Sequence, residues 1–205
     1  MNKEKELIDK LIDLAFAEDI GDGDHTTLSC IPATAMGKSK LLIKEAGVLA
    51  GIEVAKEIFN RFDPTMKVEV FINDGTEVEP GDVAMLVEGK VQSLLQTERL
   101  MLNVMQRMSG IATMTRKYAK KLEGTRTHVL DTRKTTPGMR ILEKMAVKIG
   151  GGVNHRIGLF DMILLKDNHV DFAGGIDKAI TRAKEYCKEK GKDPVSYTHL
   201  TLPTI

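Results

Sequence analysis

Cysteine is scarce in this sequence of 205 residues, which contains only Cys30 and Cys187. The two cysteines lie far apart and have neither a CxxC spacing nor histidine partners close by. This scarcity argues against a disulfide framework and against a zinc site. It fits a reducing compartment, and the cytoplasm is the expected location.

A large excess of one charge and a long uncharged apolar run are also lacking. Lys and Arg total 30 against 29 Asp and Glu, so the formal net charge is only +1. Neither nucleic acid nor an anionic membrane is therefore an expected partner. The N-terminus leads into an amphipathic pattern rather than an apolar stretch, which argues against secretion and membrane insertion. Any anion site must come from local clustering of cations.

The composition, 42% hydrophobic and 29% charged, is typical of a soluble globular protein with one large or two small domains. Apolar residues recur at helical spacing between Leu7 and Phe16, which predicts an opening helix that stops near residues 21–24. Strands separated by turns and one helix should follow. The expected strands are 38–44, 68–72 and 83–87, and the expected helix is 51–62. Together they predict an α+β domain with largely antiparallel pairing.

The pattern changes in the second half of the chain. Residues 91–123 are predicted to be helical but interrupted at Ser109-Gly110, where we expect a domain boundary. Beyond it, predicted strands alternate with predicted helices, which implies a parallel sheet or barrel. The segments are strand 128–130, helix 139–149, a glycine triplet at 150–152, strand 162–165 and helix 176–188. Residues 195–205 do not continue this alternation, and we interpret them as a non-native tail.

Cationic residues gather in this half of the chain. Arg133, Lys134 and Lys166 stand at the ends of predicted strands, Arg140 lies on the next predicted helix, and His155 and Arg156 come after the glycine triplet. In parallel α/β folds the carboxyl ends of the strands form the ligand site, and Arg and Lys there suit a ligand with several anionic groups. Any one of these cations taken alone is more often a solvated surface charge. The glycine triplet either cradles a phosphate or lets the backbone pass close to another element. Asp167 and His169 lack the spacing of metal ligands.

Several long motifs match a known family. The segment 131–140, Asp-Thr-Arg-Lys-Thr-Thr-Pro-Gly-Met-Arg, precedes the segment 150–156, Gly-Gly-Gly-Val-Asn-His-Arg, and then 165–169, Leu-Lys-Asp-Asn-His. In order and spacing these segments resemble motifs of the quinolinate phosphoribosyltransferase family, as do 17–24 with Thr26-Thr27 and 98–113. The resemblance covers about residues 5–194, and several ordered motifs are far more specific than one short pattern.

The resemblance implies a fold and a reaction. The fold would be an N-terminal α+β sandwich over residues 1–110, followed by an incomplete α/β barrel over 111–194, the type II phosphoribosyltransferase fold, working as a homodimer. The reaction would join quinolinate to phosphoribosyl pyrophosphate with Mg²⁺, giving nicotinate mononucleotide, pyrophosphate and CO2 in NAD biosynthesis. Both substrates are rich in negative charge, which suits a pocket lined by Arg and Lys.

The resemblance also implies roles for individual residues. Arg133, His155 and Arg156 would hold the quinolinate carboxylates. Lys134 and Lys166 would be catalytic and would bridge substrate and phosphates, while Arg99 would reach in from the partner subunit. The pyridine nitrogen would attack the anomeric carbon as pyrophosphate leaves, so that the protein supplies positioning and electrostatic stabilisation rather than a nucleophile. The alkylated nitrogen would then stabilise the carbanion left by loss of CO2.

The sequence departs from the family at its end, because the family's acidic Mg²⁺ ligands and later glycine-rich phosphate loops lie downstream of it. No metal ligand or cofactor-binding residue is assigned here, and the chain alone is expected to be inactive. Two alternatives remain open. One is a paralogue of the same fold, such as the molybdenum-associated phosphoribosyltransferase-like protein or a nicotinate enzyme without decarboxylation. The other is a non-catalytic anion-binding module. The His155-Arg156 pair and Arg99 favour quinolinate.

Overall fold

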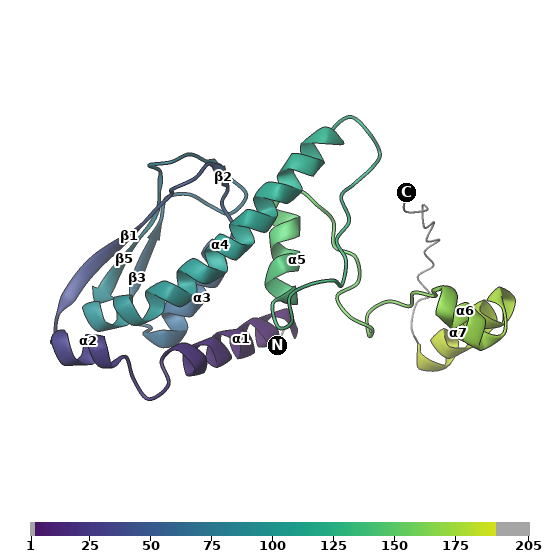
Figure 1. Ribbon diagram of the computed structural model, residues 1–205, viewed down its shortest axis with the longest axis horizontal. Helices are drawn as coiled ribbons and strands as arrows, with labels where there is room; N and C mark the ends of the chain where they lie inside the picture. Colours follow the sequence, from purple (N-terminus) through teal and green to yellow (C-terminus); the bar gives the residue numbers. More distant parts are fainter. Residues whose placement is uncertain (1–2, 192–205) are drawn as a thin grey trace. The chain divides into compact units, whose positions relative to one another are not determined.

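The computed structural model describes residues 3–191 and divides into two compact units, Met1–His155 and Arg156–Ile205, each described here by itself. The elements of the first unit are α1 (Lys3–Asp19), α2 (His25–Cys30), β1 (Met36–Leu42), β2 (Gly47–Val48), α3 (Ile52–Phe62), β3 (Lys67–Val70), β4 (Glu77–Val78), β5 (Val83–Lys90), α4 (Val91–Lys121) and α5 (Arg140–Ile149) (Figure 1). Those of the second unit are α6 (Asp167–Ala173) and α7 (Ile176–Lys190).

The first unit is built around a three-stranded antiparallel sheet of order β1-β5-β3. Strands β2 and β4 form a separate antiparallel pair. Burial alternates along β3, and the central strand β5 places Met85 and Val87 in the core, where they join Ile58 of α3 and Val104 of α4. The prediction of an N-terminal α+β sandwich with antiparallel pairing is confirmed. The expected opening helix and the helix 51–62 are present as α1 and α3.

Helix α4 runs unbroken through Ser109 and Gly110, so the predicted interruption there is wrong. The reason is that both small residues serve packing. Ser109 Oγ accepts a hydrogen bond from the Ala50 N–H at 3.0 Å and donates to the Ala50 carbonyl at 3.2 Å. Thr113, one turn on, accepts from the Val48 N–H at 2.8 Å. Helix α4 thereby satisfies backbone groups of the β2 segment that no strand pairs. The domain division near residue 110 stays a prediction.

Helix α5 packs very closely on α4 at the glycine triplet. A Cβ at Gly150 would lie 2.5 Å from the Ala112 carbonyl oxygen and 2.7 Å from Thr115 Cβ, and one at Gly152 would lie 2.7 Å from Val147 Cγ1. These distances favour close backbone approach over a phosphate cradle as the role of the triplet. Helix α5 confirms the helix predicted over residues 139–149.

The carboxyl end of α5 is capped from α4. Arg116 donates to the carbonyl of Ile149 at 3.2 Å, to that of Gly150 at 3.1 Å and to that of Gly75 at 3.4 Å. The last carbonyls of a helix have no partner within it, and a cation there also complements the helix dipole. Arg116 therefore fixes where α5 ends.

The predicted barrel is not seen within residues 3–191. Its one parallel pairing is an isolated bridge between Leu130 and Val153, and the expected strand 162–165 is wrong because this segment has no ladder partner among the described residues. A parallel strand needs neighbours for its backbone groups, and one bridge supplies too few. Helix α7 confirms the predicted helix 176–188. The predicted tail, 195–205, lies outside the described residues.

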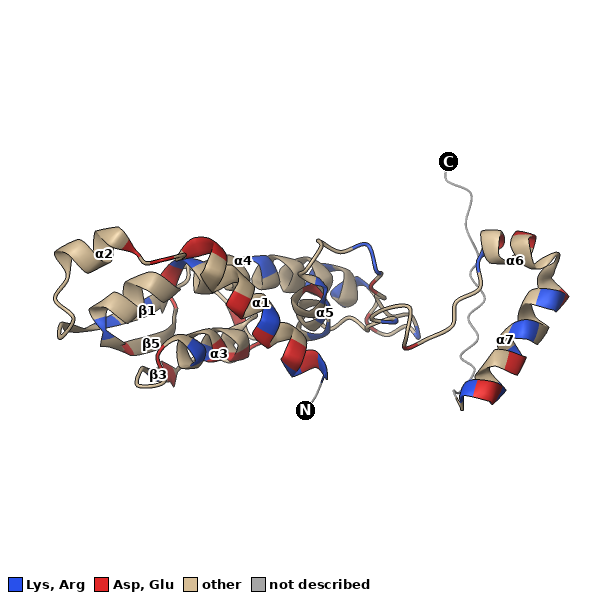
Figure 2. Cartoon of the chain, turned by 90° about the horizontal axis from the view of Figure 1, so that it is seen from below, with Lys and Arg blue, Asp and Glu red and all other residues tan. Residues whose placement is uncertain are grey.

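Charges of both signs are interspersed along the helices, as Figure 2 shows for α1 and α7. Even α4, with 31 residues, is interrupted by charged side chains. Of the helices in residues 3–191, none combines the length and the apolar character that crossing a bilayer requires.

We expect Gly150→Ala to lower the free energy of unfolding by about 1 to 3 kcal/mol, because its Cβ would overlap α4. The backbone at Gly150 has a φ of −72°, which any residue adopts, so the effect is steric. Gly110→Ala is the matched control. Position 110 lies within α4 with no atom within 4 Å of its added Cβ, so alanine should raise stability by about 0.5 to 1 kcal/mol. Urea unfolding of both variants checks this. Equal shifts for the two would contradict the account of α5 packing.

Candidate active site

The candidate site begins at the parallel bridge of the first unit. The Val153 N–H donates to the Val129 carbonyl at 2.8 Å, and the Asp131 N–H donates to the Val153 carbonyl at 3.1 Å. The two segments run in the same direction, so the residues that follow each one emerge at the same edge. On one side these residues are 131–134, and on the other they are Asn154 and His155.

A buried ion pair links these two exits. Lys144 Nζ of α5 lies 2.5 Å from Asp131 Oδ1, and the exposed fractions of the two side chains are 2% and 7%. The same carboxylate oxygen accepts the His155 N–H at 2.8 Å, while Lys144 donates to the His155 carbonyl at 3.2 Å. With its amide oriented to satisfy both ends, Asn154 donates to Asp131 Oδ2 at 2.9 Å. The pair thus holds the start of both loops.

Arg133, predicted to bind a carboxylate, lies half-buried in the loop after Asp131. Its Nε is buried and has no hydrogen-bond partner, and no other buried side-chain nitrogen or oxygen in residues 3–191 shares this state. A buried donor without an acceptor is costly, and an anion would satisfy it. Lys134 is exposed, and its backbone N–H donates to Thr132 Oγ1 at 3.0 Å. Arg133 and Lys134 are thus presented by one short, internally bonded loop.

Three charged side chains brace the rest of this loop. Arg140 Nε donates to Thr135 Oγ1 at 3.1 Å. Arg107 of α4 donates to Thr136 Oγ1 at 3.1 Å and to Glu143 Oε1 at 2.6 Å. Burial raises the pKa of Glu143, but hydrogen bonds from Arg107 and Thr136 outweigh it and leave the pKa below its ordinary value. Arg140, one of the cations singled out in the sequence, is therefore engaged in holding the loop.

In the second unit, Arg156 is buried and its Nη1 donates to the Met162 carbonyl at 3.2 Å. Lys166 is exposed at the start of α6, where its backbone N–H donates to His169 Nδ1 at 3.0 Å. Asp167 is exposed as well. Across the part of the chain that the structure describes, no three His, Cys, Asp or Glu side chains group as a metal site. Arg99 is exposed on α4 of the first unit.

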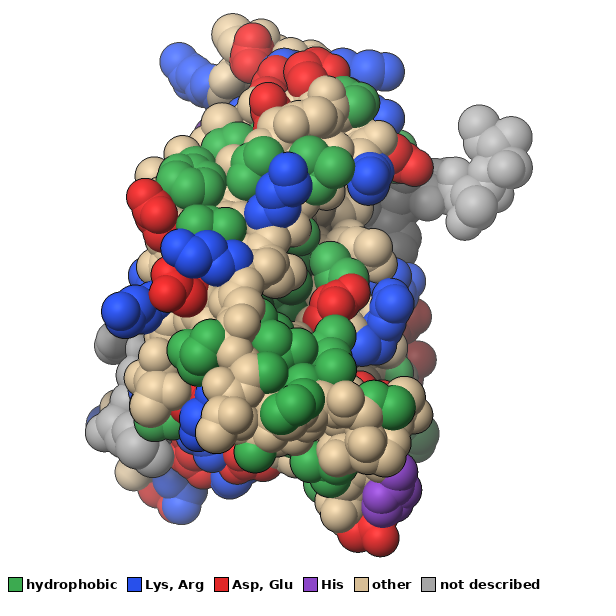
Figure 3. Space-filling model, turned by 90° about the vertical axis from the view of Figure 1, so that its left-hand side faces the viewer, with side chains coloured by type: hydrophobic (Ala, Val, Ile, Leu, Met, Phe, Trp, Pro, Cys, Tyr) green, Lys and Arg blue, Asp and Glu red, His purple; other side chains and the backbone are tan. Residues whose placement is uncertain are grey.

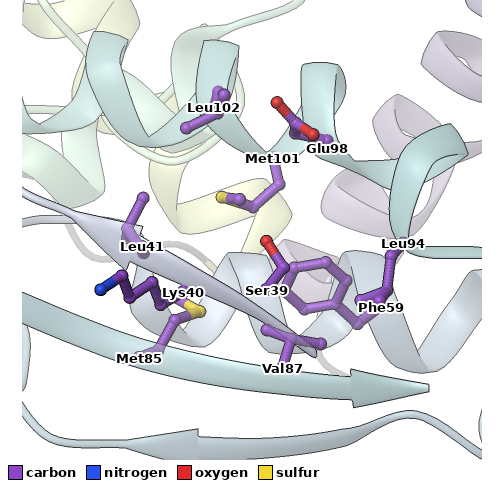
Figure 4. Close-up of a pocket in the computed structure, with 10 residues that line it drawn as sticks. All are labelled: Ser39, Lys40, Leu41, Phe59, Met85, Val87, Leu94, Glu98, Met101 and Leu102. Carbon is purple, nitrogen blue, oxygen red and sulfur yellow. The ribbon is translucent and has the colours of Figure 1, made fainter. Parts of the chain in front are cut away.

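Neither of two cavities in the first unit resembles a site for an anionic substrate. Figure 4 shows a partly open cavity of about 70 Å³ between the sheet and α4, lined mainly by apolar side chains together with Lys40 and Glu98. It is far smaller than the 300 Å³ or so that small-molecule sites usually need. A groove of about 480 Å³ is lined by four carboxylates and by Lys5 and Lys148, so its net charge does not favour an anion. Its acidic residues are Glu4, Asp9, Glu53 and Glu57.

Sequence reasoning assigned no role to Asp131, Lys144, Arg107 or Glu143. Glu143 and Lys144 fall outside the apolar stripe of the predicted helix 139–149, which indicates a solvent-facing side. The structure buries both because the loops 131–136 and 153–155 contact that side. The usable signal was the carboxylate directly after a predicted strand, since such a residue lies at the edge where parallel strands end.

Models of two domains of one family match the chain. The model described as the N-terminal domain of quinolinate phosphoribosyl transferase matches residues 24–109, and that of its C-terminal domain matches residues 111–197. Among curated proteins, quinolinate phosphoribosyltransferase [decarboxylating] 1b of Nicotiana tabacum is 47% identical over 180 residues, which are 87% of this chain and 51% of the relative. The chloroplastic nicotinate-nucleotide pyrophosphorylase [carboxylating] of Oryza sativa subsp. japonica is 46% identical and covers 95% of this chain and 53% of the relative.

A solved structure, NadC from Streptococcus pyogenes, matches with a TM-score of 0.83 and 42% identity over 88% of this chain and 64% of its own. The human nicotinic acid phosphoribosyltransferase structure, at 15% identity and a TM-score of 0.56, shares the fold alone. The chain spans about half the length of the curated relatives named above.

We expect Glu143→Gln to lower the free energy of unfolding by about 1 to 3 kcal/mol at pH 7, because it removes the charge that Arg107 and Thr136 bind. The folded-state pKa of Glu143 lies below the unfolded value of about 4.3. Its stabilisation is therefore fully present above that pH and is lost as the pH falls through the folded-state pKa. Denaturant unfolding at neutral and acid pH measures this. A difference between the two proteins that stays constant into acid would contradict the assignment.

Proposed function

The chain belongs to the quinolinate phosphoribosyltransferase family, and from this premise we propose that it forms the quinolinate-binding part of an enzyme that makes nicotinate mononucleotide. The substrates would be quinolinate and phosphoribosyl pyrophosphate, and the other products pyrophosphate and CO2. One observation from the structure carries the proposal most directly. Arg133 holds a buried, unpartnered Nε at the edge where the only parallel pairing in residues 3–191 ends.

The proposed binding of quinolinate uses Arg133, His155 and Arg156 for its two carboxylates. Guanidinium groups suit this task because their planar arrays of donors match a carboxylate. The buried state of Arg156 supports the role, since a cation withdrawn from water interacts more strongly with an anion. The exposed lysines, Lys134 and Lys166, are proposed as the catalytic cations that bridge substrate and phosphates.

The proposed chemistry needs no nucleophile from the protein. The pyridine nitrogen of quinolinate bonds to the anomeric carbon as the bond to pyrophosphate breaks, and the lysines stabilise the negative charge that develops on the departing phosphate. The carboxylate next to the alkylated nitrogen then leaves as CO2. The electron pair left on the ring carbon is stabilised by the cationic ring and takes up a proton from solvent, which gives the product. The arginines hold the acceptor ring in the attacking geometry, which lowers the entropic part of the barrier.

Magnesium is implied by the family, but the described residues point to no ligand for it. Among residues 3–191 no three His, Cys, Asp or Glu side chains group together, and no Mg²⁺ ligand is proposed there. The proposal places any Mg²⁺ ligands outside residues 3–191. The cytoplasm is the proposed compartment, which is supported by the two free cysteines.

We further propose a homodimer in which Arg99 contributes to the partner's site. Figure 3 shows hydrophobic side chains gathered among charged ones at the α2 end of the first unit. Leu95, one turn before Arg99 on α4, is 43% exposed, and Leu28 of α2 is 50% exposed. Exposed apolar side chains beside a charged residue are typical of a protein interface, which supports a partner subunit there.

We expect Arg133→Ala and Arg156→Ala each to weaken quinolinate binding at least tenfold in the full-length product of the gene, on the scale of truncating one partner of a buried charge pair. Isothermal titration calorimetry with quinolinate measures this. Arg126→Ala, which removes an exposed arginine outside both loops, is the control and should bind normally. Unchanged affinity in the two site variants would overturn the proposed carboxylate roles.

We expect subunit mixing to reveal the role of Arg99. A dimer of one Arg99→Ala chain and one Lys166→Ala chain retains one complete site if Arg99 acts across the interface. Since random mixing makes about half of the dimers mixed, about a quarter of the normal activity should return. The control mixes Arg133→Ala with Lys166→Ala, which leaves no complete site and should recover nothing. Nicotinate mononucleotide formation is the readout. Equal activity in the two mixtures would show that Arg99 does not act in the partner's site.

A further inference from the structure

The Asp131–Lys144 pair is more deeply buried than any other ion pair in residues 3–191, with side chains 7% and 2% exposed. Burying two charges costs desolvation free energy that their attraction seldom exceeds, and an apolar pair of similar size often gives equal or greater stability. The pair is therefore poorly explained by stability alone. Its hydrogen bonds indicate what else it does.

Both members of the pair bind the backbone of the same residue, His155. Asp131 Oδ1 accepts the His155 N–H at 2.8 Å, and Lys144 Nζ donates to the His155 carbonyl at 3.2 Å. Asn154, the preceding residue, is held by the same two partners, since its amide donates to Asp131 Oδ2 and to the Lys144 carbonyl, each at 2.9 Å. The main chain at His155 is thus fixed from both sides by charge-assisted hydrogen bonds, which are stronger than neutral ones.

The pair also governs the other loop, because Asp131 lies two residues before Arg133. The Arg133 carbonyl in turn accepts a hydrogen bond from Arg140 Nη2 at 3.4 Å, so the loop is held at both ends. One buried carboxylate therefore sets the spacing between the segment that presents Arg133 and the segment that presents His155. A rigid spacing matters for a ligand whose two carboxylates sit on adjacent ring atoms, since small displacements of binding groups cost much affinity.

We propose that Asp131 and Lys144 are positioning residues for the quinolinate site, which they serve by fixing the two loops against each other. This inference rests on the proposed function. Neither residue needs to touch the substrate. The pair acts on the acceptor, quinolinate, through the residues that hold its carboxylates. Its link to the sugar phosphate is weaker, because only Lys134 of the residues it positions is proposed to reach the phosphates, and Lys144 bonds the His155 segment instead.

The test uses Lys144→Met in the full-length product of the gene. We expect the KM for quinolinate to rise at least tenfold while the KM for phosphoribosyl pyrophosphate stays within about threefold, since the lost hydrogen bond loosens the acceptor loop. Ile58→Ala is the control for stability, because Ile58 is fully buried in α3, on an element that carries neither loop. It should lower the melting temperature and leave both KM values unchanged. If Lys144→Met raises both KM values equally, or neither, the inference is wrong.

A second variant covers the case in which Lys144→Met does not fold because Asp131 is left as a buried, unpaired charge. Asp131→Asn combined with Lys144→Met removes both charges and should recover much of the melting temperature. Its quinolinate KM should remain raised, since the His155 carbonyl has still lost its donor. If the double variant recovers both the melting temperature and the quinolinate KM, the pair serves stability only, and the positioning role is wrong. If the unmodified protein neither binds quinolinate nor turns it over, the proposed function itself fails, and this inference fails with it.

Discussion

The contact between Gly150 and the backbone of α4 determines where α5 lies, and the candidate site depends on that placement. A side chain at position 150 would meet the Ala112 carbonyl, so the two helices approach this closely only because it is absent. Once α5 is placed, Lys144 is directed to Asp131 and Glu143 to Arg107. A shift of α5 by even the size of a methyl group would therefore be transmitted to both loops of the site, since a close-packed interior does not deform smoothly.

Helix α4 provides the surface on which this arrangement is assembled. Its polar side chains serve as hydrogen-bonding partners for backbone that no sheet satisfies: Ser109 and Thr113 for the β2 segment, and Arg116 for the end of α5. Each of these bonds is worth only about 1 kcal/mol net, but leaving the same backbone groups buried without partners would cost more. The length and continuity of α4 thus follow from its role in connecting the sheet to α5.

Patterns of local origin were predicted well from the sequence, and long-range contacts were not. The helical periodicity of α3 and α7 and the alternation in β3 reflect which face meets the core, and this is visible in the residues themselves. The break expected at Ser109-Gly110 was wrong because the same small residues that end helices also allow a strand to approach one. The strand expected at 162–165 failed for the opposite reason, since a strand exists only through its neighbours, and no pattern within the segment supplies them.

The roles of the cations in the candidate site also depend on contacts that the sequence does not reveal. Composition alone does not separate Arg133, which follows a predicted strand, from Arg140, which lies on the next predicted helix, because both belong to one cationic motif. The structure separates them by their partners: Arg140 donates to Thr135 and to the Arg133 carbonyl, whereas Arg133 Nε lies buried without an acceptor among the described residues. Within this loop, Arg140 is therefore engaged in holding the structure, and the buried, unsatisfied Nε of Arg133 can still bind an external anion. Counting satisfied donors, rather than cations, is thus what distinguishes a brace from a ligand-binding residue in this loop.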